Sequence, residues 1–186
     1  MGYAIAEALA DEGAEVILVT GPVSVTTSKK GISIVQAESA QQMYEACAGS
    51  FPQCDGAIMT AAVADFTPAF PDSQKIKRGK ENFNVELKPT RDIAATLGTL
   101  KKPGQVLVGF ALETNNELEN AHQKLVDKNL DFIVLNSLNE AGAGYGFDTN
   151  KVVILWKNNK SRSFELKSKR EVATDVVNEI ITLMHA

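Results

Sequence analysis

Residues 2–22, GYAIAEALADEGAEVILVTGP, contain the pattern that decides the fold. We expect a helix over residues 2–12 that ends at Gly13, because glycine is favoured just past the last turn of a helix. Residues 14–20, AEVILVT, then predict a buried strand, and a Gly-Pro pair closes it. A helix that leads into a buried strand is typical of a parallel α/β sheet.

The same alternation continues along most of the chain. Further strands are predicted at residues 31–37, 55–62, 85–88, 105–111 and 131–136. Further helices are predicted at residues 39–49, 90–100, 115–128 and about 169–184. Ser39 is expected to cap its helix, with Gln42 at capping-box spacing. A glycine-rich turn is predicted at residues 141–146.

The C-terminal part of the chain has a different pattern. Residues 151–156 and 162–166 flank an Asn-Asn pair and predict an antiparallel hairpin. The last helix carries one apolar stripe for the core. We therefore expect an α/β fold, namely a three-layer, Rossmann-like, mostly parallel sheet with a C-terminal antiparallel hairpin.

Composition sets limits on the kind of protein. The 186 residues fit one domain, expected over residues 1–186. A net charge of −4 argues against a nucleic-acid-binding protein, which would usually be basic. No apolar run is long enough for a membrane span, and the first residues do not resemble a secretory signal. Two cysteines and two isolated histidines give no support to a disulfide framework or a metal site. We expect reduced thiols in a cytoplasmic protein.

Small and acidic residues follow the strand predicted at 55–62. Ala61 and Ala62 would let a ligand approach the backbone, and Asp65 could accept hydrogen bonds from an amine or hydroxyl group. The alternative is an aspartate that only caps a turn. Because α/β sheets bind ligands at the carboxyl ends of their strands, this segment is a candidate site.

Residues 66–84 break the alternation and form a connection that is long for a compact domain. They include the basic cluster Lys75-Ile76-Lys77-Arg78. Such a cluster is ordinarily a solvated surface. On a loop of a net-acidic protein it could instead close over a phosphate-bearing ligand, where a lysine stabilises developing negative charge.

Three more candidates lie near helix and strand ends. Thr90 is a suitable N-cap, and the first turn of its helix could hold a phosphate, although simple capping is the alternative. Phe110, at the end of a strand, could offer its ring to a flat ligand or belong to the core. Lys124 and Lys128 share one helix face and could hold an anion or face solvent.

The order of these motifs resembles that of phosphopantothenoylcysteine synthetase. The matching segments are AAVAD at 61–65, KIKR at 75–78, TRDI at 90–93, GFALET at 109–114, KLVDKNLDFIVLN at 124–136, GFDTN at 146–150 and SK at 168–169. The resemblance extends over essentially the whole chain, from Met1 to the last helix.

The resemblance implies a ligase that joins 4′-phosphopantothenate to L-cysteine in a cytoplasmic homodimer, with CTP and Mg²⁺. The substrate carboxylate attacks the α-phosphate of CTP, which gives an acyl-cytidylate and pyrophosphate. The cysteine amine then forms the amide and releases CMP. Charge builds up on the α-phosphate, so a lysine and Mg²⁺ are the expected stabilisers.

The resemblance also implies residue roles. Lys75 corresponds to a catalytic, nucleotide-contacting lysine, and Ala61, Ala62 and Asp65 correspond to the substrate pocket. The implied nucleotide-binding residues are Gly2, Asp65, Lys75, Thr90, Arg91, Asp92, Ile93, Phe110, Lys124 and Lys128. No residue is implied as a protein ligand to a metal, and the hairpin at 151–166 is the implied subunit contact.

This sequence departs from the family pattern at Arg78, where lysine is usual, and at Arg91, where proline is usual. The family's first strand, its phosphate loop and a catalytic asparagine would lie ahead of Met1. We therefore expect this chain alone to be inactive or severely impaired, and full ligase activity of the purified chain would contradict this.

Two other functions stay open. A nicotinamide- or flavin-dependent oxidoreductase would use the same kind of sheet, but the sequence lacks a GxGxxG fingerprint. A non-catalytic binding domain or fragment is the other alternative. ATP in place of CTP is the alternative nucleotide.

Overall fold

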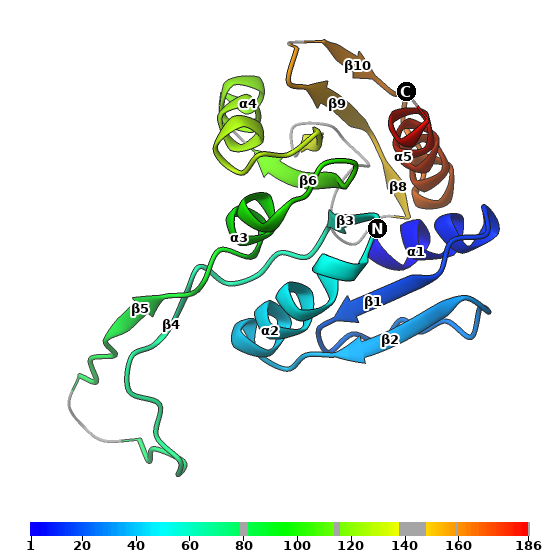
Figure 1. Ribbon diagram of the computed structural model, residues 1–186. Coiled ribbons are helices and arrows are strands. Elements are labelled where there is room, and N and C mark those ends of the chain that lie inside the picture. The colour runs from blue at the N-terminus through cyan, green and yellow to red at the C-terminus, as the bar shows by residue number, and fades with distance from the viewer. Residues whose placement is uncertain (79–81, 114–115, 138–147, 159, 186) are drawn as a thin grey trace.

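The computed structural model describes residues 1–78, 82–113, 116–137, 148–158 and 160–185 (Figure 1). The glycine-rich turn predicted at 141–146 lies outside these residues. The elements in chain order are α1 (Gly2–Asp11), β1 (Val16–Thr20), β2 (Ile32–Gln36), α2 (Ala40–Ser50), η1 (Phe51–Gln53), β3 (Gly56–Met59), β4 (Phe66–Pro68), β5 (Leu87–Pro89), α3 (Ile93–Leu100), β6 (Val106–Glu113), α4 (Glu117–Asp127), β7 (Phe132–Ser137), β8 (Thr149–Asn150), β9 (Val152–Trp156), β10 (Ser161–Ser163), β11 (Lys167–Ser168) and α5 (Lys169–Met184).

The main sheet has the strand order β10-β9-β7-β6-β3. β3, β6 and β7 are parallel, whereas β9 and β10 run antiparallel to their neighbours. This confirms the predicted α/β fold with a mostly parallel sheet and a C-terminal hairpin. Two local predictions are confirmed as well. Gly13 follows α1 with a left-handed φ of 88°, and Ser39 and Gln42 form a capping box at the start of α2.

Helices cover both faces of the main sheet, so the fold has three layers. Because side chains alternate along a strand, Val108 and Val134 face one side while Leu107 and Ile133 face the other. The first side packs against α1 and α5, and the second packs against α2, α3 and α4. No helix among the described residues is long and apolar enough to cross a lipid bilayer.

β1 and β2 form a parallel pair of their own. In the described parts of the chain, no strand is hydrogen-bonded to both β1 and β3. β1 is connected to the rest of the protein by contacts with α1 and α2. Among the described residues, the edges of β1 and β3 are therefore not joined by a backbone ladder.

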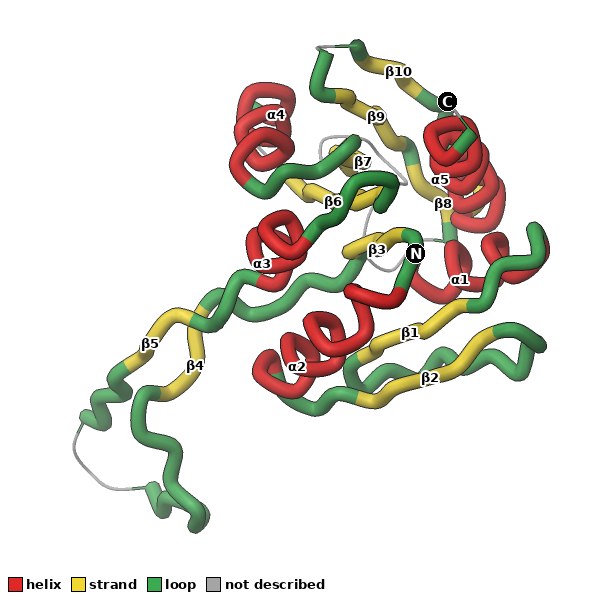
Figure 2. Tube along the Cα trace, in the orientation of Figure 1, coloured by secondary structure: helices red, strands yellow, loops and turns green. Residues whose placement is uncertain are grey.

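β4 and β5 form an arm that projects from the body of the protein (Figures 1 and 2). The prediction of a loop over 66–84 is wrong at its start, because Phe66–Pro68 pair antiparallel with Leu87–Pro89. The strand predicted at 85–88 is likewise displaced to 87–89 and belongs to the arm rather than to the main sheet. The ladder brings together two segments that are distant in sequence, and local patterns do not show such pairing.

Asp131 joins the start of β7 to the neighbouring elements. Its Oδ1 accepts a hydrogen bond from Lys101 Nζ at 2.6 Å, and its Oδ2 accepts one from the Leu107 N–H at 2.7 Å. The Lys101 side chain is only 11% exposed. Asp131→Ala is expected to lower the free energy of unfolding by about 2–4 kcal/mol, because it leaves a buried ammonium and a buried N–H without this acceptor.

Urea denaturation measures this loss. The matched control is Asp11→Ala, which removes a surface ion pair with Lys29 and is expected to cost less than about 1 kcal/mol. Equal effects of the two substitutions would contradict the role of Asp131.

Candidate functional site

A cavity of about 880 Å³ opens between β1 and β3 and extends to the root of the arm. It gathers residues that the sequence places on separate elements. The predicted site residues that line it are Gly2, Ala61, Asp65, Thr90, Arg91, Asp92, Ile93, Phe110, Lys124 and Lys128. Of the predicted site residues, Ala62 and Lys75 are not part of the lining. The structure therefore brings most of the predicted set to one cavity.

Thr90 ties the two ends of the arm together. Its backbone N–H donates to the Asp65 carbonyl at 2.9 Å, and its hydroxyl donates to the Ala64 carbonyl at 2.7 Å. The prediction that Thr90 caps a helix starting at residue 90 is therefore wrong. Its hydroxyl is used across the arm, and this contact holds Asp65 at the edge of the cavity.

Asp92 is the N-cap of α3 instead. Its Oδ1 accepts a hydrogen bond from the Ala95 N–H at 3.0 Å, and the helix begins at Ile93. A carboxylate at a helix N-terminus interacts favourably with the helix dipole. The first turn of α3 is thus already capped by a carboxylate. The sequence prediction of a phosphate site at this turn did not take that carboxylate into account.

Lys128 approaches Asp92 from the end of α4. The distance between Lys128 Nζ and Asp92 Oδ2 is 3.0 Å. Tight backbone packing fixes this approach, because a Cβ atom on Gly98 of α3 would lie 2.1 Å from the Lys128 carbonyl oxygen. Next along the chain, Asn129 has a left-handed φ of 50° and donates from Nδ2 to the Gly98 carbonyl at 3.0 Å. α3 therefore packs closely against the end of α4, and Lys128 lines the cavity.

The Asp92 carboxyl should titrate at unusually low pH. Burial opposes its ionised form, but hydrogen bonds from the Ala95 backbone and from Lys128 outweigh this and lower its pKa below 3.8. A depressed carboxyl pKa gives stability that is present above pH 3.8 and is lost as the pH falls below that value. Because Asp92 is half exposed, this contribution should stay under about 1 kcal/mol.

NMR titration of the Asp92 carboxyl carbon measures this pKa directly. Lys128→Ala should raise the value towards 3.8 while the hydrogen bond from Ala95 keeps part of the shift. A midpoint at or above 3.8 in the unmodified protein would contradict the described geometry.

Sequence reasoning missed two neighbours of the site. The Arg91 guanidinium lies 4.8 Å from the centre of the Tyr44 ring, so α2 helps to place this cavity residue. A Cβ atom on Gly2 would lie 2.9 Å from Thr60 Oγ1, so the start of α1 fits closely against the end of β3. Both contacts join segments that are far apart in the chain, and no local pattern predicts them.

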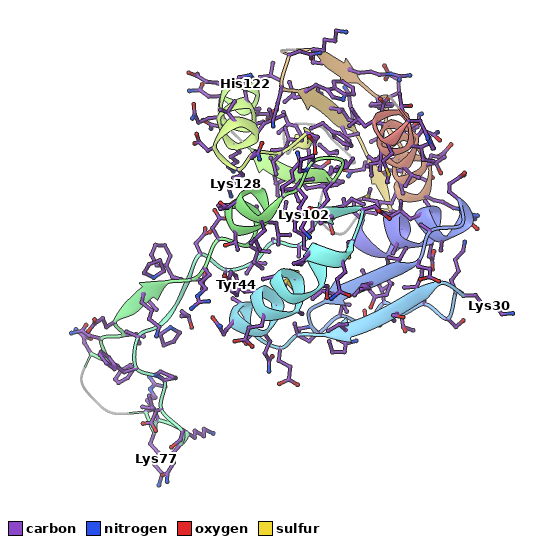
Figure 3. All side chains as sticks on the ribbon, in the orientation of Figure 1. Lys30, Tyr44, Lys77, Lys102, His122 and Lys128 are labelled. Carbon is purple, nitrogen blue, oxygen red and sulfur yellow. The ribbon has the colours of Figure 1, made fainter. Side chains whose placement is uncertain are left out.

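The basic cluster at 75–78 lies away from the cavity. Residues 75–78 are exposed and have no regular secondary structure. Figure 3 shows Lys77 at the far end of the arm, whereas Lys128 and Tyr44 lie near its root. The structure therefore does not bring Lys75 to the other predicted site residues.

The cavity wall contains the carboxylates of Asp65 and Asp92 and the ammonium groups of Lys124 and Lys128. In the described part of the chain, no group of three or more histidine, cysteine, aspartate or glutamate side chains is placed to hold a metal ion. Such a wall can bind an anionic ligand with polar groups, and the Phe110 ring can contact an apolar or flat part of it.

Comparison with known proteins gives a consistent result. Residues 1–184 match the family described as DNA/pantothenate metabolism flavoprotein C-terminal domain. A relative named cysteine/cysteine sulfinic acid decarboxylase, from an unknown prokaryotic organism, is 52% identical over all of this chain and 52% of its own length. The coenzyme A biosynthesis bifunctional protein CoaBC of Bacillus subtilis is 44% identical over 98% of this chain and 45% of its own length.

The solved structures agree. The crystal structure of the C-terminal domain of the bifunctional protein CoaBC superposes with a TM-score of 0.82 at 38% identity, covering 99% of this chain and 82% of that one. The chain spans about half the length of the curated relatives above.

Proposed function

The chain belongs to the family of DNA/pantothenate metabolism flavoprotein C-terminal domains, and we propose that it carries the phosphopantothenate–cysteine ligase activity of coenzyme A biosynthesis. The observation that carries this proposal is the cavity, which gathers Asp65, Phe110, Lys124 and Lys128 from three separate segments of the chain. Relatives named for coenzyme A biosynthesis support it. The reaction would take place in the cytoplasm.

The proposed reaction begins with attack of the 4′-phosphopantothenate carboxylate on the α-phosphate of CTP, which releases pyrophosphate. The cysteine amine then attacks the acyl carbon and CMP leaves. Arg91, Lys124, Lys128 and Asp65 line the cavity. In this proposal the three cations would offset phosphate charge, and Asp65 would accept hydrogen bonds from the substrate or the nucleotide. Ala61 leaves room for close approach, with Ala62 beside it.

Lys75 would join this site only by movement of the arm. The root of the arm lines the cavity through Phe66 and Pro89, while Lys75 lies farther out. Closure of the arm over bound nucleotide would bring a flexible ammonium group to the phosphates, and such closures commonly complete catalytic sites.

Mg²⁺ fits this chain only as part of a nucleotide complex. Mg²⁺ is usually held by one or two carboxylates together with substrate phosphates and water. Glu15, Asp55, Asp65 and Asp92 are carboxylate residues of the cavity lining, and Asp92 is already engaged by Lys128. When bound, the ion would neutralise phosphate charge.

A homodimer is also proposed, with the exposed edge strand β10 of the hairpin and the arm as the two candidate contacts. β9 lies between β7 and β10, and its Val152 and Ile154 are buried in the core. The arm instead exposes large apolar side chains, with Phe70 82% exposed. A second copy that covers these side chains would remove this apolar surface from water. Sedimentation equilibrium tests it, and a monomer at all concentrations would contradict it.

Calorimetric titration separates the proposed function from the alternatives. CTP with Mg²⁺ should bind, and Lys124→Ala should weaken it. NADPH, as a probe for the oxidoreductase alternative, should not bind. Binding of NADPH without binding of CTP would reject the ligase proposal. Binding of ATP and not CTP would keep the reaction class but change the nucleotide.

A further inference from the structure

The two carboxylate oxygens of Asp92 serve two different helices. Oδ1 caps α3 through the Ala95 N–H, and Oδ2 holds the ammonium group of Lys128 from α4. Both residues line the cavity. One side chain therefore sets the start of one helix and also the position of a cation that belongs to another.

The ammonium group of a lysine keeps a fixed position only if another group holds it. Its four-carbon stem is flexible, and ordering the stem when a ligand binds weakens the affinity. The backbone of Lys128 is already fixed, because its N–H donates to the Lys124 carbonyl at 3.1 Å and its carbonyl oxygen lies against Gly98. Asp92 extends this order to Nζ at the end of the side chain. An ammonium group has three donors, and the contact with Asp92 uses one of them.

We propose that Asp92 is a positioning residue for nucleotide binding, holding the Lys128 ammonium group in the cavity wall so that its remaining donors meet a phosphate of the ligand. This inference rests on the proposed function. The negative charge of Asp92 does not repel the ligand strongly, because the α3 N-terminus and Lys128 both offset it. The pair stays intact when the phosphate binds.

Asp92→Asn tests this with little change in the helix cap. Asparagine caps helices about as well as aspartate, so the melting temperature should stay close to that of the unmodified protein. The ion pair is weakened, and calorimetry should show CTP binding about five- to tenfold weaker. Asp92→Ala removes the helix cap together with the ion pair. It should therefore lower the melting temperature as well as the affinity, and it serves as the comparison variant.

A double-mutant cycle shows whether Asp92 acts through Lys128. In a Lys128→Ala background, Asp92→Asn should change the affinity for CTP by less than about twofold. An equal effect in both backgrounds would overturn the inference, as would unchanged binding. Tighter binding by the Asp92→Asn variant would also overturn it, because Asp92 would then compete with the phosphate. If the unmodified chain binds no nucleotide, the proposed function is rejected, and this inference is rejected with it.

Discussion

Gly98→Ala is expected to lower the free energy of unfolding by about 3 kcal/mol. The added methyl group would lie 2.1 Å from the carbonyl oxygen of Lys128 and 2.8 Å from its carbonyl carbon. These are backbone atoms, so no side-chain rotation relieves the clash, and α3 must move away from the end of α4. The displacement also moves Lys128, so the affinity for CTP should fall in the same variant. Urea denaturation measures the first effect and calorimetry the second.

Gly49→Ala is the matched control. Gly49 also lies in a helix, but nothing comes within 4 Å of a Cβ atom built there. Alanine has the higher helix propensity, so this substitution should raise stability by roughly 0.5–1 kcal/mol. If both substitutions stabilise the protein, the close packing of α3 against α4 is contradicted.

Lys75→Ala is expected to reduce the rate of pyrophosphate release by about 10²- to 10³-fold in any polypeptide that contains this chain and carries out the reaction. The expected cause is loss of a cation that stabilises charge on the phosphates. Because residue 75 is exposed on the arm, the melting temperature should not change. Lys77→Ala removes the same charge two residues away and should reduce the rate by less than about threefold. Equal losses for the two variants would mean that only the net charge of the arm matters.

The main layers of the fold can be predicted from the sequence because they depend on local periodicity. Val16–Thr20 and Val106–Glu113 are apolar runs, and the stripe on α5 points to one buried face. Capping chemistry is also local, so Ser39 and Gln42 are predicted correctly. Those patterns contain no information on which strand pairs with which.

Where the sequence prediction fails, contacts between distant segments decide the structure. Thr90 and Asp92 are both acceptable caps, and the choice falls on Asp92 because the Thr90 hydroxyl donates to Ala64 across the arm. Asp65 and Phe110 both line the cavity, but the prediction that they lie at strand ends is wrong, because Phe110 lies within β6 and packs against the core, and Asp65 directly precedes β4. The pairing of Asp92 with Lys128 is not predictable from the sequence, because it depends on how α3 packs against α4.

The separation of β1 and β2 from the main sheet has a mechanical consequence. Every backbone hydrogen bond in a continuous sheet resists separation of the strands on either side of it. Among the residues that the structure describes, β1 and β3 share none, and β1 contacts α1 and α2 instead. Packing against these two helices, and not a strand-to-strand ladder, therefore supports this side of the cavity.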